Sequence, residues 1–216
     1  MKENTSGQAF RITVEDLTKT FNKELIVRNF SYQFSTGTTT AITGSNGSGK
    51  STLLKLLSGI IVPNKGKITY EHQKKLIPDE KWFRHISFCS PAQELIEEFT
   101  LKEIVDFHLR FKKFEENFSK EDFYEIAYFS EHINKKIALF SSGMKQRLKL
   151  ALAMFTQSNV LFLDEPTTNM DLEGIKWYRE NIIKIVPNRL VVIASNQKHE
   201  YEFCDQLISI ADYKRH

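Results

Sequence analysis

The sequence is poor in cysteine, proline and glycine. Of its 216 residues, two are cysteines, five are prolines and nine are glycines. Two thiols cannot form the dense disulfide framework of a small secreted protein, so we expect Cys89 and Cys204 to be reduced and buried on apolar faces of a strand or helix. The low content of proline and glycine excludes a fibrous chain and a low-complexity linker.

Long apolar runs are also missing. The strongest runs begin at Leu150, Val160 and Leu190, and all are far shorter than the roughly 18 residues that a membrane-spanning helix needs. We therefore expect no direct insertion into a membrane. If the protein serves a membrane process, another chain must supply the membrane-spanning part. The first ten residues are polar and lack the apolar stretch of a secretory signal, which favours a cytoplasmic protein.

Neither sign of charge dominates. The 30 lysines and arginines and the 27 acidic residues leave a formal net charge of +3. No basic block alternates with aromatic residues as a nucleic-acid groove requires, so we expect no nucleic-acid partner. His108 has no cysteine or histidine partner at metal-binding spacing and is expected to be a packing residue.

What the sequence does contain is the pattern of one globular domain. Hydrophobic residues make up 41% and charged residues 26%, close to the average for soluble proteins. In the segment from Phe10 to about Phe34, aromatic residues alternate with polar ones, which predicts an antiparallel sheet. From Thr39 onward, apolar strands alternate with helices, which predicts a parallel sheet covered on both faces. Between about residues 91 and 155 the pattern is helical and predicts an inserted lobe.

A glycine-rich segment, GSNGSGKS at Gly44–Ser51, follows one predicted strand and precedes a helix. Order and spacing match the GxxxxGK[ST] phosphate-binding loop, whose glycines let backbone amides surround a polyphosphate at a helix start. We expect Lys50 to reach the β- and γ-phosphates and Ser51 to bind Mg²⁺. The plain alternative is a flexible turn. The other residues expected to contact the nucleotide are Gly44, Ser45, Asn46, Gly47, Ser48, Gly49 and Thr52.

A second motif, VLFLDEP at 160–166, is an apolar strand that ends in two carboxylates. In a parallel sheet the end of this strand lies beside the phosphate loop, so Asp164 could hold Mg²⁺. Glu165, one residue further out, could polarise an attacking water. Acidic residues are common at strand ends, so this motif is weak evidence alone and becomes strong only together with the phosphate loop.

A third motif, FSSGMKQR at 140–147, opens a long amphipathic helix whose start can receive an anion. Here the sequence resembles the LSGGQ-type signature of ABC ATPases. The resemblance extends along the chain and implies an α/β fold: a P-loop NTPase parallel sheet core with an antiparallel β subdomain and an inserted helical subdomain. Residues 1–216 would form a single ATP-binding domain. Its core would comprise residues 1–90 and 156–216, and its helical lobe residues 91–155.

The resemblance also implies partners and further site residues. Ser141 and Gly143 would cap the γ-phosphate bound by a second copy, in a head-to-tail homodimer that sandwiches two ATP molecules. Phe21 would stack on adenine, although it could equally belong to the core. Asp171 would bridge the dimer interface, and it could at the same time cap the helix that begins at Leu172.

Two positions depart from the family pattern. A glutamine usually follows the strand that corresponds to HISFC, but Pro91 stands there, and Gln93 is either its substitute or a solvated loop residue. A histidine usually follows the strand that corresponds to LVVIAS, but Asn196 stands there and cannot carry positive charge. His199 is expected to be a surface or capping residue. The resemblance therefore predicts slow hydrolysis that rests on Glu165.

The leading hypothesis is the ATP-binding and ATP-hydrolysing subunit of an ABC transporter. It would lie on the inner face of the cell membrane through a separate transmembrane permease chain, docked near residues 91–100. The alternatives are a nucleotide-dependent regulatory module with little turnover and a non-transport ABC ATPase.

Overall fold

A computed structural model describes residues 10–22 and 24–214. Its antiparallel sheet has the strand order β2-β1-β4-β5. Tyr32 and Phe34 on β2 alternate with exposed Ser31 and Gln33, as the sequence pattern predicts. The strands of this sheet are β1 (Phe10–Phe21), β2 (Glu24–Ser35), β4 (Lys65–His72) and β5 (Lys75–Ile77).

The second sheet is parallel and has the strand order β6-β7-β8-β3-β9. All residues of β7 and β8 are buried, as expected for a parallel sheet that is covered on both faces. The predicted α/β fold is therefore confirmed. The strands are β3 (Thr39–Thr43), β6 (Ile86–Cys89), β7 (Val160–Asp164), β8 (Leu190–Ala194) and β9 (Gln206–Ser209).

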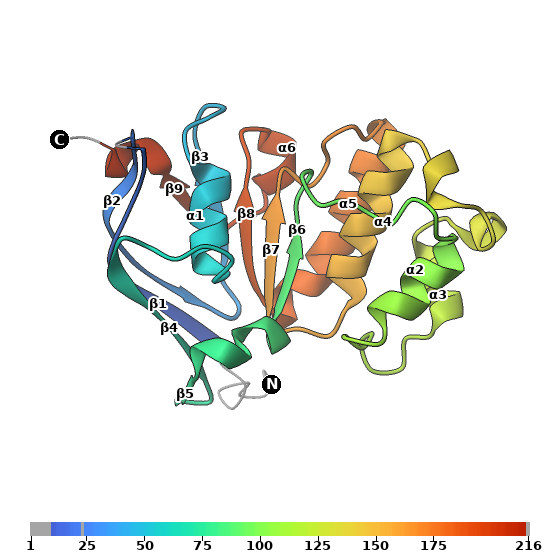
Figure 1. Ribbon diagram of the computed structural model, residues 1–216, viewed down its shortest axis with the longest axis horizontal. Helices are drawn as coiled ribbons and strands as arrows, with labels where there is room; N and C mark the ends of the chain where they lie inside the picture. Colours follow the sequence, from blue (N-terminus) through green and yellow to red (C-terminus); the bar gives the residue numbers. More distant parts are fainter. Residues whose placement is uncertain (1–9, 23, 215–216) are drawn as a thin grey trace.

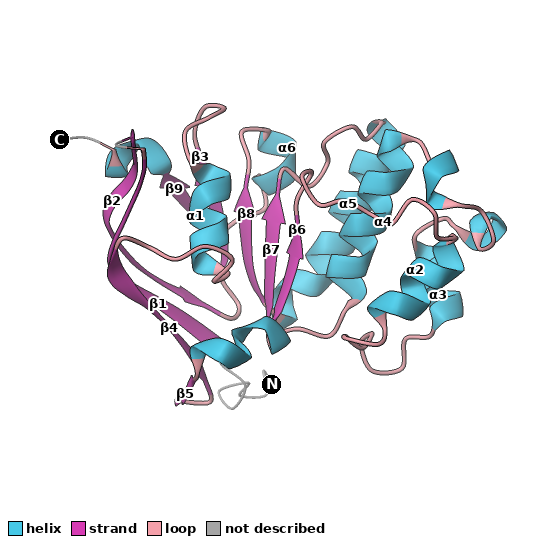
Figure 2. Cartoon of the chain, in the orientation of Figure 1, coloured by secondary structure: helices cyan, strands magenta, loops and turns pink. Residues whose placement is uncertain are grey.

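The helices divide between the two faces and one end of the molecule. In Figure 1 the antiparallel sheet and α1 lie on one side of β6, β7 and β8, while α4 and α5 lie on the other, with α2 and α3 beyond them. Figure 2 shows the same arrangement coloured by secondary structure, with α1 and α6 among the strands and α2, α3, α4 and α5 apart from them. The helices are α1 (Lys50–Leu57), α2 (Leu101–His108), α3 (Lys120–Ile126), α4 (Ser142–Phe155), α5 (Leu172–Ile185) and α6 (Lys198–Tyr201). Short 3-10 turns span Asp79–Arg84, Ser130–His132, Ile137–Leu139, Val186–Asn188 and Ile210–Tyr213.

Two hydrophobic clusters share the parallel sheet as their common wall. Leu161 and Leu163 of β7 pack with α4 and α5 and with the helices beyond them. Val160 and Phe162 of the same strand pack with α1 and the antiparallel sheet. This division follows from the period of two along a strand, and it fixes the register of β7 because a slip by one residue would exchange the two clusters.

Helix starts in the helical region have local causes. Thr100 caps α2 and Ser119 caps α3. In each reciprocal capping box the cap hydroxyl accepts from the amide three residues later, and the carboxylate of that residue accepts from the cap amide. Cys89 is buried on β6, as predicted. Cys204 is half-buried in the turn before β9, so the prediction that it lies on a strand or helix face is wrong.

The helices among the described residues include none that is both long enough and apolar enough to cross a bilayer.

Candidate active site

The glycine-rich segment forms the connection between the end of β3 and the start of α1. Gly49 caps α1 with a positive φ of 99°, and a Cβ at this position would lie 2.6 Å from the side chain of Ile26. Gly44 is equally restricted, since its Cβ would lie 2.6 Å from the hydroxyl of Ser48. Both positions therefore require glycine for conformation and for space.

Two polar groups of this loop are buried. The Lys50 side chain is only 4% exposed, and its Nζ donates to the carbonyls of Gly44 at 3.0 Å and Ser45 at 3.1 Å. The hydroxyl of Ser48 is buried and has no hydrogen-bond partner in the described part of the chain. Because a buried unpaired hydroxyl is costly, it fits a loop that is completed by an anionic ligand. Ser45, Asn46 and Gly47 are exposed, and Thr52 is half-buried on α1.

Ser51 and Asp164 meet across the sheet. The Ser51 hydroxyl donates to Asp164 Oδ1 over 2.8 Å, although the two residues are 113 positions apart. Burial raises the pKa of Asp164, while the Ser51 hydrogen bond opposes that shift and the neighbouring Glu165 adds to it. A hydroxyl and a carboxylate at the rim of a phosphate loop are the hard oxygen ligands that Mg²⁺ prefers, so this donor set fits the ion.

Glu165 lies directly beyond the end of β7 in a constrained turn. Its φ is +41°, and its amide donates to the carbonyl of Ala194 over 2.9 Å. Such a φ is sparsely populated for residues with side chains, and such residues concentrate at functional sites. The half-buried Glu165 therefore has a backbone fixed to the end of β8.

Asn196 contacts the phosphate loop. Its Nδ2 donates to Oδ1 of Asn46 over 2.7 Å, and both side chains are exposed. The loops that follow β3 and β8 are thus joined by a side-chain bond, which agrees with their neighbouring positions in the sheet. The sequence indicated both residues but not this contact.

The signature segment begins α4 as a capped helix. Ser141 is the cap, and its hydroxyl accepts from the amide of Met144 over 3.2 Å. A Cβ on Gly143 would lie 2.9 Å from the carbonyl of Asn169, so this helix start packs closely against the loop that follows Glu165. That loop ends at Asp171.

Asp171 caps α5 and accepts from the amide of Gly174 over 2.8 Å, as the capping alternative predicted. Both Asp171 and the adjacent Leu172 are exposed, with Leu172 at 85%. The structure describes one chain, so the bridging role of Asp171 stays a prediction.

Two further predicted site residues, Gln93 and Phe21, make contacts within their own segments. Gln93 uses its side chain within its own turn, where Oε1 accepts from the Ser90 amide at 3.0 Å and Nε2 donates to the Phe88 carbonyl at 3.2 Å. The structure therefore does not bring Gln93 to Ser51 and Asp164 by any hydrogen bond among its described residues. Phe21 is 43% exposed at the end of β1, with the Lys19 ammonium 4.7 Å from the ring centroid.

Sequence reasoning missed a buried polar cluster behind Glu165 and Asn196. The carboxylate of Glu200 accepts from Thr167 and Ser195, and His199 Nε2 lies 2.9 Å from the hydroxyl of Thr167. His199 lies half-buried near the start of α6, and its contact with Thr167 was not predicted from the sequence. The only signal in the sequence is an acidic residue that follows the strand by a few positions.

Comparison with known proteins identifies relatives over nearly the whole chain. A family profile described as ABC transporter matches residues 27–168. The chain is 34% identical to the uncharacterized ABC transporter ATP-binding protein YybJ of Bacillus subtilis over 93% of its own length and 89% of that protein. It is 30% identical to the zinc uptake system ATP-binding protein ZurA of Listeria monocytogenes over 81% of its length and 71% of that protein.

Solved structures share the fold. A putative ABC transporter ATP-binding protein from Pyrococcus furiosus superposes with a TM-score of 0.79 at 22% identity, over 95% of this chain and 100% of that one. A bacterial Atm1-family ABC exporter with ATP bound gives a TM-score of 0.77 at 15% identity, over 94% of this chain and 38% of that one.

Proposed function

The chain belongs to the ABC transporter family, and we propose that it is an ATP-binding subunit that hydrolyses ATP to drive transport through a separate membrane chain. The observation that carries the proposal is the 2.8 Å bond between Ser51 and Asp164. It joins the end of the phosphate loop to the end of β7, directly before Glu165, so the binding groups and the proposed general base meet at one edge of the sheet.

The loop residues bind and orient the nucleotide in this proposal. The amides of residues 44–51 and the start of α1 face phosphate oxygens, and Lys50 exchanges its bonds to the carbonyls of Gly44 and Ser45 for bonds to phosphate. The buried Ser48 hydroxyl gains the partner that it lacks among the described residues. Phe21 is exposed enough to stack on adenine.

Ser51 and Asp164 would hold Mg²⁺, which when bound neutralises charge on the phosphates. Glu165 accepts a proton from the attacking water, and its fixed backbone positions the carboxylate for that step. Asn196 would offer an amide donor to the γ-phosphate, at the position where the family pattern usually has a histidine. Since Asn196 cannot become charged, we expect hydrolysis to be slow and to rest on Glu165.

A second copy would complete each site. Ser141 and Gly143 lie at the exposed start of α4, where free amides and the helix dipole suit a γ-phosphate. Asp171 and the exposed Leu172 lie next to that helix start in the same chain and are available to a partner. This arrangement supports a head-to-tail homodimer with two nucleotides between the copies.

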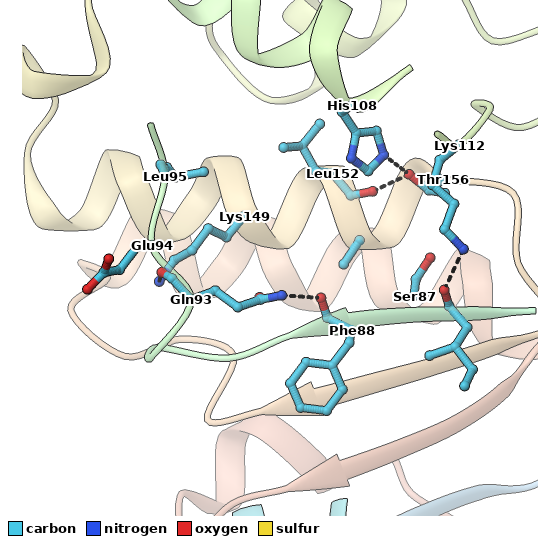
Figure 3. A pocket seen from close by; sticks show the side chains of 12 residues that line it. Ser87, Phe88, Gln93, Glu94, Leu95, His108, Lys112, Lys149, Leu152 and Thr156 are labelled. Carbon is cyan, nitrogen blue, oxygen red and sulfur yellow. Dashed lines mark hydrogen bonds between the residues drawn. The ribbon is translucent and has the colours of Figure 1, made fainter. Parts of the chain in front are cut away.

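A cavity of about 340 Å³ between β6 and α4 supports a docking site for the membrane chain (Figure 3). One wall consists of residues 93–95, and α4 holds the start of this segment: Lys149 Nζ donates to the carbonyls of Ser90, Pro91 and Gln93 at 3.3, 2.9 and 3.2 Å. Lys145 of α4 also pairs with Glu97. Movement of this segment on docking would therefore pull directly on the signature helix.

The comparisons support the transport role and give no support to a regulatory module or a non-transport ATPase. On this proposal the protein stays on the inner side of the cell membrane through its permease.

The test is phosphate release by purified protein with MgATP. Glu165→Gln should lower turnover by about 100-fold or more, because a general base contributes ~10²–10⁴ to rate, while ATP binding is retained. Turnover per molecule of the wild type should rise with protein concentration, since two copies form each site. Unchanged turnover in Glu165→Gln, combined with complete loss in Asn196→Ala, would contradict the assigned roles.

A further inference from the structure

A carboxylate is buried behind the candidate active site without a basic partner among the ion pairs of the described residues. Glu200 is 1% exposed and lies on the short helix α6, beside the end of β8 (Figure 1). Burial of a carboxylate is unfavourable unless hydrogen bonds compensate for the lost water. The partners of these hydrogen bonds indicate the role of Glu200.

The two oxygens of Glu200 bond two different loops. Oε1 accepts from the amide of Thr167 at 2.7 Å and from its hydroxyl at 2.5 Å, and Oε2 accepts from the hydroxyl of Ser195. Thr167 lies two residues after Glu165, and Ser195 immediately precedes Asn196. One side chain therefore connects the loop of the general base to the loop of the phosphate-facing amide.

Further bonds make this connection rigid. The Ser195 hydroxyl also accepts from the amide of Gln197 at 2.8 Å, and the Ser195 amide donates to the carbonyl of Ile42 at 3.1 Å. The carbonyl of Glu200 accepts from the hydroxyl of Tyr178 on α5 at 2.8 Å. Because these bonds attach Ser195 to β3 and Glu200 to α5, the two loops have little freedom to move separately.

The hydrogen bond from the Thr167 hydroxyl to Glu200 also determines how His199 contacts Thr167. Its hydroxyl has one proton, which it donates to Glu200, so the contact with His199 requires His199 to donate from Nε2. His199 is thus a second group that holds Thr167, from the same helix as Glu200.

We propose that Glu200 is a positioning residue for hydrolysis, whose buried carboxylate holds the loops of Glu165 and Asn196 in the one arrangement that aligns the attacking water. The proposal rests on the proposed ATPase function. On this proposal Glu200 acts through the two loops and not by contact with the nucleotide or the attacking water. A displacement of about 1 Å in a reacting group can cost ~10² in rate, so the effect of losing this connection falls on turnover more than on binding.

The experiment compares kcat and KM for MgATP in Glu200→Ala and Glu200→Gln. We expect Glu200→Ala to lower kcat by about 10- to 100-fold with KM changed by less than about threefold. Glu200→Gln should recover most of the lost kcat, because its amide oxygen can accept from Thr167 and its amide nitrogen can donate to Ser195. Thr167→Val should lower kcat and Thr167→Ser should not, which provides a test if Glu200→Ala fails to fold.

The matched control is Asp205→Ala. Asp205 Oδ2 accepts from the amide and hydroxyl of Thr39 at 2.8 and 2.7 Å, the same pair of bonds as at Thr167. These bonds lie at the start of β3, the opposite end of the strand from the phosphate loop. Loss of stability alone would affect this variant too, whereas we expect its kcat to stay within about twofold of wild type.

A normal kcat in both Glu200→Ala and Thr167→Val would overturn the proposal, as would an equal fall of kcat in Glu200→Ala and Asp205→Ala. Glu165→Gln is measured beside them. If Glu165→Gln keeps wild-type turnover, the proposed function is wrong at its catalytic base. If Glu165→Gln is inactive and the Glu200 and Thr167 variants are normal, only the positioning role fails.

Discussion

His108 gives the sharpest prediction about stability and pH. The residue ends α2 and lines the cavity in Figure 3, where its ring points at Thr156. The Thr156 hydroxyl donates to the carbonyl of Leu152 at 2.5 Å, so at the 2.6 Å contact His108 must donate from Nε2. Burial, and beyond it the Lys112 ammonium, lowers the pKa of His108 from 6.5 to about 4.

The sign follows from which state binds the proton. Below its ordinary pKa the unfolded chain takes up a proton at His108 that the folded chain refuses until about pH 4. The contribution of neutral His108 to the free energy of unfolding is therefore fully present above about pH 6.5, and it falls as the pH decreases from about 6.5 to about 4. The difference between the two pKa values corresponds to a loss of about 2.5 kcal/mol between about pH 7.5 and pH 4.5.

The perturbation is His108→Gln, which keeps a donor for Thr156 and does not titrate. Urea unfolding followed by circular dichroism at about pH 7.5 and pH 4.5 gives the free energy of unfolding of both proteins. We expect the wild type to lose about 2.5 kcal/mol more than His108→Gln over this interval. Thr156→Val separates the lost hydrogen bond from the titration, since it should reduce stability by ~1–3 kcal/mol already at about pH 7.5. Equal losses in wild type and His108→Gln would refute the reasoning.

Two further substitutions test packing and charge. Gly143→Ala places a Cβ 2.9 Å from the carbonyl of Asn169. Overpacking of this kind lowers the free energy of unfolding by ~1–3 kcal/mol. Because the start of α4 must move, we also expect lower ATPase activity, measured by phosphate release. Arg189→Met should lower the free energy of unfolding in urea by ~3–5 kcal/mol, because the Arg189 side chain is 5% exposed and also bonds two backbone carbonyls. Glu115→Gln should lower it by less than ~1 kcal/mol, because the Glu115 side chain is 45% exposed. Similar losses in both variants would contradict this assignment.

The fold and the outline of the site could be predicted because they follow from local rules. Strand ends of a parallel sheet share an edge, so the order of motifs alone brings Ser51 near Asp164. The alternation around Tyr32 on β2 and the Asp171 cap of α5 likewise depend on neighbours in sequence. These features need no knowledge of side-chain contacts between distant segments.

The parts that were missed depend on such contacts. Glu200 is bonded by Thr167, 33 residues earlier, and Asn196 by Asn46, 150 residues earlier. A glutamate on a surface helix and a glutamate that joins two loops have the same local pattern, so periodicity cannot distinguish them. For Gln93 the sequence left two alternatives open, and its side-chain bonds within its own exposed turn favour the loop residue.

The position of β3 inside the parallel sheet, between β8 and the edge strand β9, has a consequence for biosynthesis. This strand leads into the phosphate loop, yet its two neighbours are β8 and β9, which are the last two strands to be synthesised. Until residue 190 and beyond have emerged, β3 has two unpaired edges and its apolar residues have no sheet in which to lie. We therefore expect the nascent chain to depend on chaperones until late in translation, and shortened chains that lack β8 to aggregate without binding ATP.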